Sequence, residues 1–201
     1  MHNIQNKGVA VYCASSNNIA PEFIQQARTV GKLLAHAGVP VVSGGGSAGL
    51  MAAVIEGALE SGGQAIGVLP QFMVDKGWDH PKLTKRIITQ TMHQRKMQMA
   101  QLSCAAIALP GGVGTLDELF EIITWRQLHL FDGNVVICNT DGFYNRLLEH
   151  LQFTAENGFM RPAAPQKLWQ VAENAADAVT AALSPAQDPG IQYHMPDKPI
   201  V

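Results

Sequence analysis

The fold is decided by residues 105–118, which read AAIALPGGVGTLDE: an apolar strand-like run, then a glycine turn, then a helical pattern. Glycine at such a turn lets backbone N–H groups approach an anion closely, and the helix that follows adds the positive end of its dipole. The segment therefore predicts a phosphate-binding turn. Glu118 is unusual there, because a carboxylate one turn into the helix repels a phosphate unless it faces another group. In an alternative reading that stays open here, Thr115 and Glu118 form a capping box.

The same order of strand and helix repeats along the chain. Short apolar runs predict strands at residues 9–13, 39–43, 64–69, 103–109 and 134–138. Helical patterns fall at residues 21–37, 48–61, 92–102, 115–130 and 142–156, with an edge strand expected at 167–171 and a last helix at 174–183. Strands joined by helices make right-handed crossovers, so we expect an α/β, Rossmann-like, doubly wound parallel sheet in a single domain.

Composition limits the classes of partner. The chain has 201 residues, of which 47% are hydrophobic and 15% charged, and its net charge is -2. We expect one domain over residues 1–183 and an extended or disordered tail over residues 184–201. A chain without a basic field is not expected to bind nucleic acid or a membrane. Residues 1–7 lack the apolar core of a targeting segment, so we expect a cytoplasmic protein with a small-molecule partner.

The cysteines do not indicate a metal or a disulfide framework. Cys13, Cys104 and Cys138 are far apart, and each lies in an apolar run. This pattern is typical of small buried side chains in a reducing compartment. No C-x-x-C pair or His/Cys cluster is present in the sequence, so we expect no metal.

Parallel sheets of this kind bind ligands beyond the carboxyl ends of their strands. Residues 14–17 offer the hydroxyl of Ser15, and residues 44–49 match G-x-G-x-x-G and include Gly45. No acid stands about twenty positions later, where a dinucleotide site needs one, so we do not expect NAD. A contact with a nucleotide or sugar phosphate, or tight helix–strand packing, explains these glycines better. The long connection over residues 71–90 favours a lid, a specificity element or an oligomer contact.

One helix face combines apolar and cationic side chains. Met92, Arg95, Lys96 and Met99 share this face of the predicted helix. In an isolated helix the two cations would extend into water from a half-buried stem. Here the helix precedes the glycine turn by about one strand-and-helix unit. Its first half and the turn are therefore expected to meet over one crevice, where a guanidinium can bind an anion.

The motif Met92-His93-x-Arg95-Lys96 stands before PGGVGTLDE at residues 110–118 and after SGGGSAGLM at residues 43–51. Together these motifs resemble the LONELY GUY family of cytokinin riboside 5'-monophosphate phosphoribohydrolases, long mislabelled as lysine decarboxylases. The resemblance extends from Val11 to about Leu151. It implies hydrolysis of the N-glycosidic bond of a nucleoside 5'-monophosphate, commonly an N6-prenylated adenosine or AMP, to the free base and ribose 5-phosphate. It also implies a homodimer with the nucleotide near the subunit interface, and no metal or cofactor.

The resemblance places the essential arginine and glutamate of the family on Arg95 and Glu118, the two candidate catalytic residues. Breaking a ribosyl C–N bond leaves positive charge on the sugar, which a carboxylate near C1' stabilises. Whether Arg95 holds the phosphate and ribose or aids departure of the base stays open. The candidate substrate-binding residues are Ser15, Gly45, Met92, Lys96, Gly111, Gly112, Val113, Gly114, Thr115 and Glu121. For Glu121, a solvated helix position is the simpler interpretation.

Two places depart from the family pattern. Residues 75–81 read DKGWDHP where the family often has D-K-E-V-A-H-P, and Thr91 stands where the family often has aspartate. Base selectivity is therefore expected to depend on other contacts, with Asp79 as a hydrogen-bonding candidate and Trp78 as a stacking candidate. His93 and His129 are more simply structural or surface residues than catalytic acids.

Two other functions are compatible with parts of the pattern. The same turn suits a non-catalytic carrier or sensor of a phosphorylated ligand, similar to the molybdenum-cofactor carrier proteins. The presence of both Arg95 and Glu118 favours the enzyme, because a phosphate carrier gains nothing from an acid beside the anion. A pyridoxal-phosphate decarboxylase is disfavoured, since Lys96 lies in no recognisable Schiff-base setting.

Overall fold

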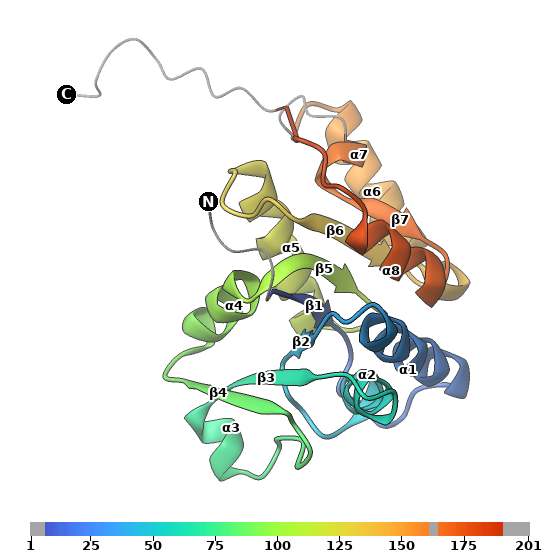
Figure 1. The fold of residues 1–201 in the computed structure, drawn as a ribbon. Coiled ribbons are helices and arrows are strands. Elements are labelled where there is room, and N and C mark those ends of the chain that lie inside the picture. Colours follow the sequence, from blue (N-terminus) through green and yellow to red (C-terminus); the bar gives the residue numbers. More distant parts are fainter. Residues whose placement is uncertain (1–6, 161–164, 191–201) are drawn as a thin grey trace, which may run out of the picture.

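Seven parallel strands form one sheet at the centre of the protein (Figure 1). The computed structural model describes residues 7–160 and 165–190. The strands stand in the order β4-β3-β2-β1-β5-β6-β7, and each neighbouring pair is parallel. Their bounds are β1 Gly8–Tyr12, β2 Val41–Ser43, β3 Ala65–Pro70, β4 Lys85–Thr89, β5 Ser103–Ala108, β6 Asn134–Cys138 and β7 Gln170–Ala172.

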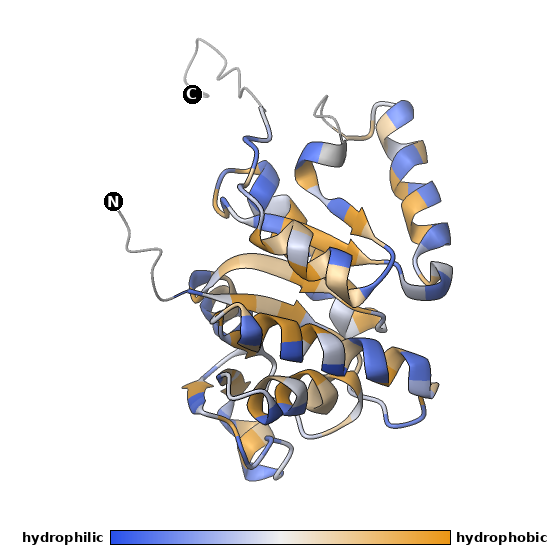
Figure 2. Cartoon of the chain, turned by 45° about the vertical axis from the view of Figure 1, so that its right-hand side comes forward, coloured by the Kyte–Doolittle hydropathy of each residue, from blue (hydrophilic) through white to orange (hydrophobic). Residues whose placement is uncertain are grey.

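Helices cover both faces of the sheet and divide the core into two layers. One layer packs under α1 (Pro21–His36), α2 (Gly49–Glu60) and α8 (Ala175–Leu183). The other packs under α4 (Met92–Gln101), α5 (Val113–Gln127) and α6 (Asn145–Glu156). Figure 2 shows hydrophobic strands between helices that carry hydrophilic residues, as burial of apolar surface requires. The short helices are α3 (Gln71–Asp75), the 3-10 turn η2 (Thr140–Gly142) and α7 (Pro165–Leu168).

The chain changes direction across the sheet between β1 and β5. From β1 it adds β2, β3 and β4 on one side, then returns to place β5, β6 and β7 on the other side. Tyr12 and Ala108 are paired in register where β1 and β5 end. The carboxyl ends of β1 and β5 therefore form the topological switch point, the place where such sheets leave a crevice for ligands.

The expected doubly wound parallel sheet is confirmed, and each strand and helix that we expected is present with small shifts at its ends. The connection over residues 71–90 was predicted wrongly as a long loop, because it contains α3 and the edge strand β4. In β4 only Thr89 is buried, and Lys85 and Arg86 are exposed. An edge strand with so little buried surface lacks the apolar run by which the other strands were recognised.

The capping box between Thr115 and Glu118 does not form. α5 begins at Val113, two residues earlier than expected, and its N-cap residue Gly112 makes no side-chain cap. Thr115 therefore lies inside the first turn, and the Glu118 carboxylate accepts a hydrogen bond from Arg95 instead. The capping interpretation is therefore wrong.

Other expectations concern the cysteines and the tail. Cys13 and Cys138 are buried, whereas Cys104 is half-buried and its thiol donates to the Gly8 carbonyl at 3.3 Å. Residues 184–190 form neither helix nor strand, and the rest of the expected tail, residues 191–201, lies outside the described residues. Among the helices of the described ranges, none has the length and apolar character needed to cross a membrane.

Candidate active site

The loops after β1, β2 and β5 are tied together at the switch point. Ala14 N donates to the Pro110 carbonyl at 3.2 Å, which joins the loop after β1 to the glycine turn after β5. Gly49 N donates to Asn17 Oδ1 at 2.9 Å, and Met51 N donates to the Ala14 carbonyl at 3.2 Å. These contacts fix the positions of the three loops relative to one another at the carboxyl end of the sheet.

Arg95 of α4 and Glu118 of α5 form a buried ion pair next to these loops. Arg95 Nη1 donates to Glu118 Oε1 at 3.2 Å, and Arg95 Nε donates to the Val68 carbonyl at 3.0 Å. Only 8% of the Arg95 side chain and 9% of the Glu118 side chain are exposed. The structure thus brings together the two candidate catalytic residues, and Arg95 does not extend into water along its own helix.

One nitrogen of the Arg95 guanidinium has no hydrogen-bond acceptor among the described residues. Within the described residues, Nη2 has no acceptor, and no side-chain nitrogen or oxygen is both sealed from solvent and unpaired. Nη2 is therefore open to solvent beside the ion pair. Gly44 makes room for it, since a Cβ at this position would lie 1.9 Å from Nη2. A side chain at Gly44 would displace the guanidinium.

Burial sets the charge state of Glu118. Loss of hydration raises the pKa of Glu118 to about 7, against the lowering effect of the Arg95 cation. The neighbouring carboxylates of Asp117 and Glu121 act in the raising direction, and the Lys96 cation opposes them. Near neutral pH the Glu118 carboxyl is thus divided between its two protonation states, which is typical of functional carboxyl groups.

Lys96 lies next to the ion pair but binds carboxylates of its own. Its Nζ lies 3.0 Å from Asp117 Oδ2 and 3.2 Å from Glu121 Oε1. Partial burial alone would lower the pKa of Lys96, but the hydrogen bonds with Asp117 and Glu121 raise it. Lys96 is therefore a charged link between α4 and α5 whose cation already faces two carboxylates. Glu121 belongs to this link and is not a purely solvated position.

The glycine turn exposes the amino end of α5. Gly112, Val113 and Gly114 are exposed, whereas Thr115 is buried. A Cβ at Gly111 would lie 2.1 Å from Thr115 Oγ1, so glycine is needed for the turn to fold back on the helix. The first backbone N–H groups of α5 have no side-chain cap. A helix end of this kind fits a phosphate or another anion.

The remaining candidate binding residues differ in their surroundings. Ser15 and Met92 are exposed. Gly45 is buried; its N–H donates to Ser43 Oγ at 3.1 Å, and its carbonyl accepts from His80 N at 2.8 Å. A Cβ at Gly45 would lie 2.5 Å from Leu69 Cδ1. Gly45 therefore serves the packing of its loop and has no main-chain N–H left for a ligand.

The positions that depart from the family pattern have structural partners. Thr91 caps α4, its hydroxyl accepting from Gln94 N at 3.1 Å. Asp79 forms an ion pair with Arg86 of β4, so its carboxylate is engaged. Half of the Trp78 surface is exposed, and the Lys76 ammonium lies 4.7 Å from the ring centroid. Of the two candidates for a base contact, Trp78 keeps the larger accessible surface.

His93 and His129 are both exposed. Neither takes part in the Arg95–Glu118 pair. Within residues 7–160 and 165–190, no group of three or more His, Cys, Asp or Glu side chains is arranged to hold a metal ion.

Sequence reasoning missed three residues of the site: Tyr12, Gly44 and Asp117. Tyr12 ends β1 and shares the α4/α5 side of the sheet with Ala10, a placement that strand alternation could have indicated. Gly44 was noticed only as part of a glycine run, because its contact with Arg95 joins distant segments. Asp117 gave no signal, since its partner Lys96 lies on another helix.

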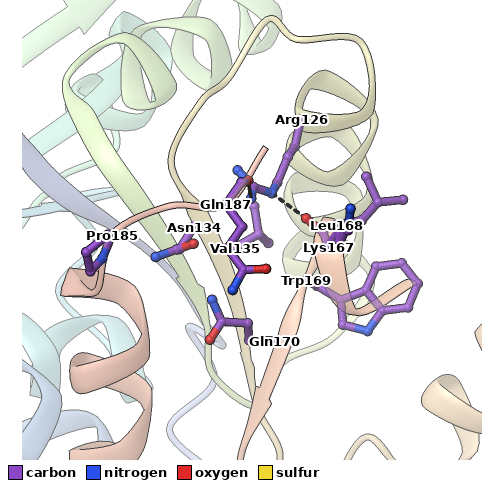
Figure 3. Close-up of a pocket in the computed structure, with 9 residues that line it drawn as sticks. All are labelled: Arg126, Asn134, Val135, Lys167, Leu168, Trp169, Gln170, Pro185 and Gln187. Atoms are coloured by element: carbon purple, nitrogen blue, oxygen red, sulfur yellow. Dashed lines mark hydrogen bonds between the residues drawn. The ribbon is translucent and has the colours of Figure 1, made fainter. Parts of the chain in front are cut away.

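A cavity of about 250 Å³ lies at the other end of the strands, away from the Arg95–Glu118 pair (Figure 3). Asn134 and Gln170, which line it, are the first residues of β6 and β7. Ligands of parallel α/β sheets bind at the carboxyl ends of strands, so this cavity is not where the fold predicts the active site.

Comparison with known proteins identifies relatives of this chain. A family model described as "Possible lysine decarboxylase" matches residues 51–182. The cytokinin riboside 5'-monophosphate phosphoribohydrolase of Rhodococcoides fascians is 37% identical over 180 residues, which span 89% of this chain and 90% of that protein. A phosphoribohydrolase of the same name from Arabidopsis thaliana is 37% identical over 173 residues, spanning 86% of this chain and 75% of that protein.

Solved structures show the same fold at lower identity. The molybdenum cofactor carrier protein of Chlamydomonas reinhardtii superposes with a TM-score of 0.66 at 24% identity, covering 88% of this chain and 96% of that one. The molybdenum cofactor binding protein of Rippkaea orientalis gives a TM-score of 0.66 at 20% identity, covering 88% of this chain and 95% of that one. At such identities the likeness concerns the fold alone.

Proposed function

Since this chain belongs to the LONELY GUY family of cytokinin riboside 5'-monophosphate phosphoribohydrolases, we propose that it hydrolyses the N-glycosidic bond of an adenosine 5'-monophosphate, N6-prenylated or plain. Water adds to C1', the electrons of the C–N bond move to the base, and the base takes up a proton. The products are the free cytokinin or adenine and ribose 5-phosphate. The observation that carries this proposal is the buried Arg95–Glu118 pair at the switch point.

Glu118 has the chemistry that the breaking bond requires. The transition state carries oxocarbenium-like positive charge on the ribose, and an ionised carboxylate beside C1' stabilises that charge more than it stabilises the neutral ground state. Glu118 is costly to ionise in the free protein, because burial raises its pKa to about 7. A cation forming next to it removes part of that cost. Glu118 therefore acts through its charge and by holding the ribose or the attacking water.

The phosphate has a separate place in this scheme. The exposed amino end of α5, at Gly112, Val113 and Gly114, binds the phosphate through main-chain N–H groups. Gly111 and Thr115 shape the turn, and the exposed side chains of Ser15 and Met92 contact the substrate. Binding energy from the phosphate then fixes C1' against Glu118. The open Nη2 of Arg95 donates to the phosphate or ribose.

For Lys96 the contacts favour a positioning role over direct phosphate binding. Its cation is balanced by Asp117 and Glu121, both within 3.2 Å. Lys96 holds α4 against α5, which sets the separation between Arg95 and Glu118. Gly45 contributes through the packing of its own loop and not by direct contact with the substrate.

We also propose that the protein is a cytoplasmic homodimer with its site near the subunit interface. Exposed apolar side chains on α4 and α5 support this proposal: Met97 is 46% exposed, Phe120 39% and Val113 85%. Apolar groups that flank a site and face water are typical of interfaces. Sedimentation of the protein at several concentrations tests the dimer.

A non-catalytic carrier of a phosphorylated ligand is the second candidate, favoured only by the fold shared with the molybdenum cofactor carrier protein. A carrier of an anion has no use for an ionisable carboxyl group in its ligand crevice, because the charged form repels the ligand. Burial of Glu118 beside Arg95 therefore counts against this function.

The test is a product assay. The protein is incubated with AMP, isopentenyladenosine monophosphate, the unphosphorylated riboside and other mononucleotides, and the products are separated by chromatography. We expect free base and ribose 5-phosphate from the adenosine monophosphates, little product from the riboside, and no turnover by Glu118→Gln. Tight nucleotide binding without product would favour the carrier.

A further inference from the structure

Tyr12 is a buried residue at the switch point that the proposed mechanism does not use. It is the last residue of β1 and is 3% exposed. Its ring belongs to the layer formed with α4 and α5, which also contains Met99, Leu119 and Ile122. The side chain therefore rises from the central strand between the two helices that carry Arg95 and Glu118.

The hydroxyl of Tyr12 has no hydrogen-bond partner among the described residues. None of the hydrogen bonds among the described residues involves it, and in this part of the chain no side-chain oxygen is both unpaired and sealed from solvent. The hydroxyl is consequently not completely sealed from solvent, although the residue is almost wholly buried. Tyr144 shows the contrasting case, because its buried hydroxyl donates to the Leu109 carbonyl at 2.7 Å.

Tyr12 ends β1 on the side of the sheet that is covered by α4 and α5, the two helices that carry Arg95 and Glu118. The ionised groups that act on Tyr12 are Glu118, Glu121 and Arg95. Burial raises the pKa of Tyr12 strongly, the two carboxylates raise it further, and Arg95 lowers it. Tyr12 thus stays protonated and keeps an O–H donor on the side of the sheet that carries Arg95 and Glu118.

We propose that the Tyr12 hydroxyl donates a hydrogen bond to a ribose hydroxyl of the bound nucleotide. This inference rests on the proposed function, in which the phosphate occupies the amino end of α5 and C1' lies next to Glu118. The 2'- and 3'-hydroxyls stand on the two ring carbons that follow C1', so both lie close to Glu118, and a neutral phenol is a suitable partner for a neutral hydroxyl. The bond orients the sugar ring so that C1' faces the carboxylate.

Tyr12→Phe tests the inference when it is combined with substrates that lack one hydroxyl. The value of kcat/KM is measured for wild type and variant with AMP, 2'-deoxy-AMP and 3'-deoxy-AMP. We expect Tyr12→Phe to lower kcat/KM for AMP about fivefold to tenfold, as for the loss of one hydrogen bond. On the analogue that lacks the bonded hydroxyl, the loss should fall to less than about twofold. The analogue that shows this reduced loss identifies the hydroxyl.

A structural role of Tyr12 predicts a different result. An equal loss on all three substrates, or no loss on AMP, would overturn the inference. Tyr144→Phe is the matched control, because it removes a buried hydroxyl that is engaged by the Leu109 carbonyl. Tyr144→Phe is expected to lower the melting temperature and to change kcat/KM by the same factor on each substrate.

Binding measurements separate this inference from the proposed function. If wild type releases no base from any nucleotide, the proposed function fails, and calorimetry with ribose 5-phosphate, 2-deoxyribose 5-phosphate and 3-deoxyribose 5-phosphate still tests Tyr12. Tyr12→Phe should then weaken binding of ribose 5-phosphate about fivefold to tenfold and leave one deoxy sugar unaffected. Uniform affinities for the three sugars in wild type and variant would contradict the inference.

Discussion

Two buried arginines at opposite ends of the sheet have different partners. Arg126, 3% exposed, donates from Nε to the Lys167 carbonyl (Figure 3). It also donates from Nη1 to the Asp132 and Gly133 carbonyls and from Nη2 to the Gln187 carbonyl. Arg95, 6% exposed, donates to one carbonyl and one carboxylate and keeps Nη2 open.

The difference in partners is the reason why the proposed catalytic role goes to Arg95 and not to Arg126. At Arg126, main-chain carbonyls use each guanidinium nitrogen, and the group joins the end of α5 to the loop before β6 and to the segment after α8. All four of these partners are uncharged carbonyl groups. Arg95 instead faces a carboxyl group whose pKa is raised to about 7. Burial alone therefore does not mark a functional arginine; an ionisable partner and an unused donor do.

Exchanging each arginine for methionine tests this difference and gives the largest expected effect. Arg95→Met should lower kcat/KM for AMP by about 10³-fold, because the open donor and the partner of Glu118 are lost together. Arg126→Met should keep kcat/KM within about threefold and lower the free energy of unfolding by about 2–4 kcal/mol, since four carbonyls lose their donor. Kinetics below the melting temperature and urea titrations measure the two effects. Similar activity losses for both variants would remove the distinction.

Glu118 should make stability depend on pH in a direction opposite to that of a salt-bridged surface acid. Its pKa in the folded protein, about 7, exceeds the ordinary value of 4.5, so the folded state binds the proton more tightly than the unfolded chain. Stability is then lost as pH rises from about 4.5 through 7. This difference in pKa corresponds to about 3 kcal/mol.

Glu118→Gln lacks this titration. As the pH is raised, the free energy of unfolding of the variant should therefore increase relative to that of the wild type. The gain between pH 5 and pH 8 is expected to approach about 3 kcal/mol in urea titrations of the two proteins. A difference in stability between variant and wild type that does not change with pH would show that Glu118 has an ordinary pKa.

Gly44→Ala tests the role of Arg95 without changing Arg95 itself, because Gly44 lies against its guanidinium. A Cβ at Gly44 would lie 1.9 Å from Arg95 Nη2, so the guanidinium must move, and we expect kcat/KM to fall about tenfold to 100-fold. Gly46→Ala is the control, because its Cβ would meet only the flexible Met51 side chain at 3.0 Å and the Trp78 carbonyl at 3.9 Å. Its kcat/KM should stay within about threefold. Equal effects of both substitutions would show that loop geometry, not Arg95, is responsible.

Most of the fold could be predicted from the sequence because buried strands of a parallel sheet are continuous apolar runs. β1, β5 and β6 are of this kind, with most or all of their residues buried. β4 could not be found in this way, since it stands at the edge of the sheet and buries only Thr89 completely. The start of α5 was placed late because its first residues belong to the exposed glycine turn.

The candidate site was predictable where motif and topology agreed. Arg95 and Glu118 were expected to meet because the helices that carry them both begin at the carboxyl ends of parallel strands. The structure places Arg95 Nη1 3.2 Å from Glu118 Oε1. The carboxylate partners of Lys96 were not predictable, since they depend on how α4 is turned against α5. The carbonyl partners of Arg126 leave no signature either, because any residue type supplies a carbonyl.

The pH dependence of kcat/KM tests most directly that an ionised Glu118 drives the reaction. We expect kcat/KM for AMP to rise about tenfold per pH unit in the acid range and to level off above about pH 7, where the free protein carries the carboxylate. The substrate phosphate titrates near pH 6, and the pH dependence of ribose 5-phosphate binding measures its separate contribution. After this correction, a profile that is flat between pH 5 and pH 9 would contradict the account.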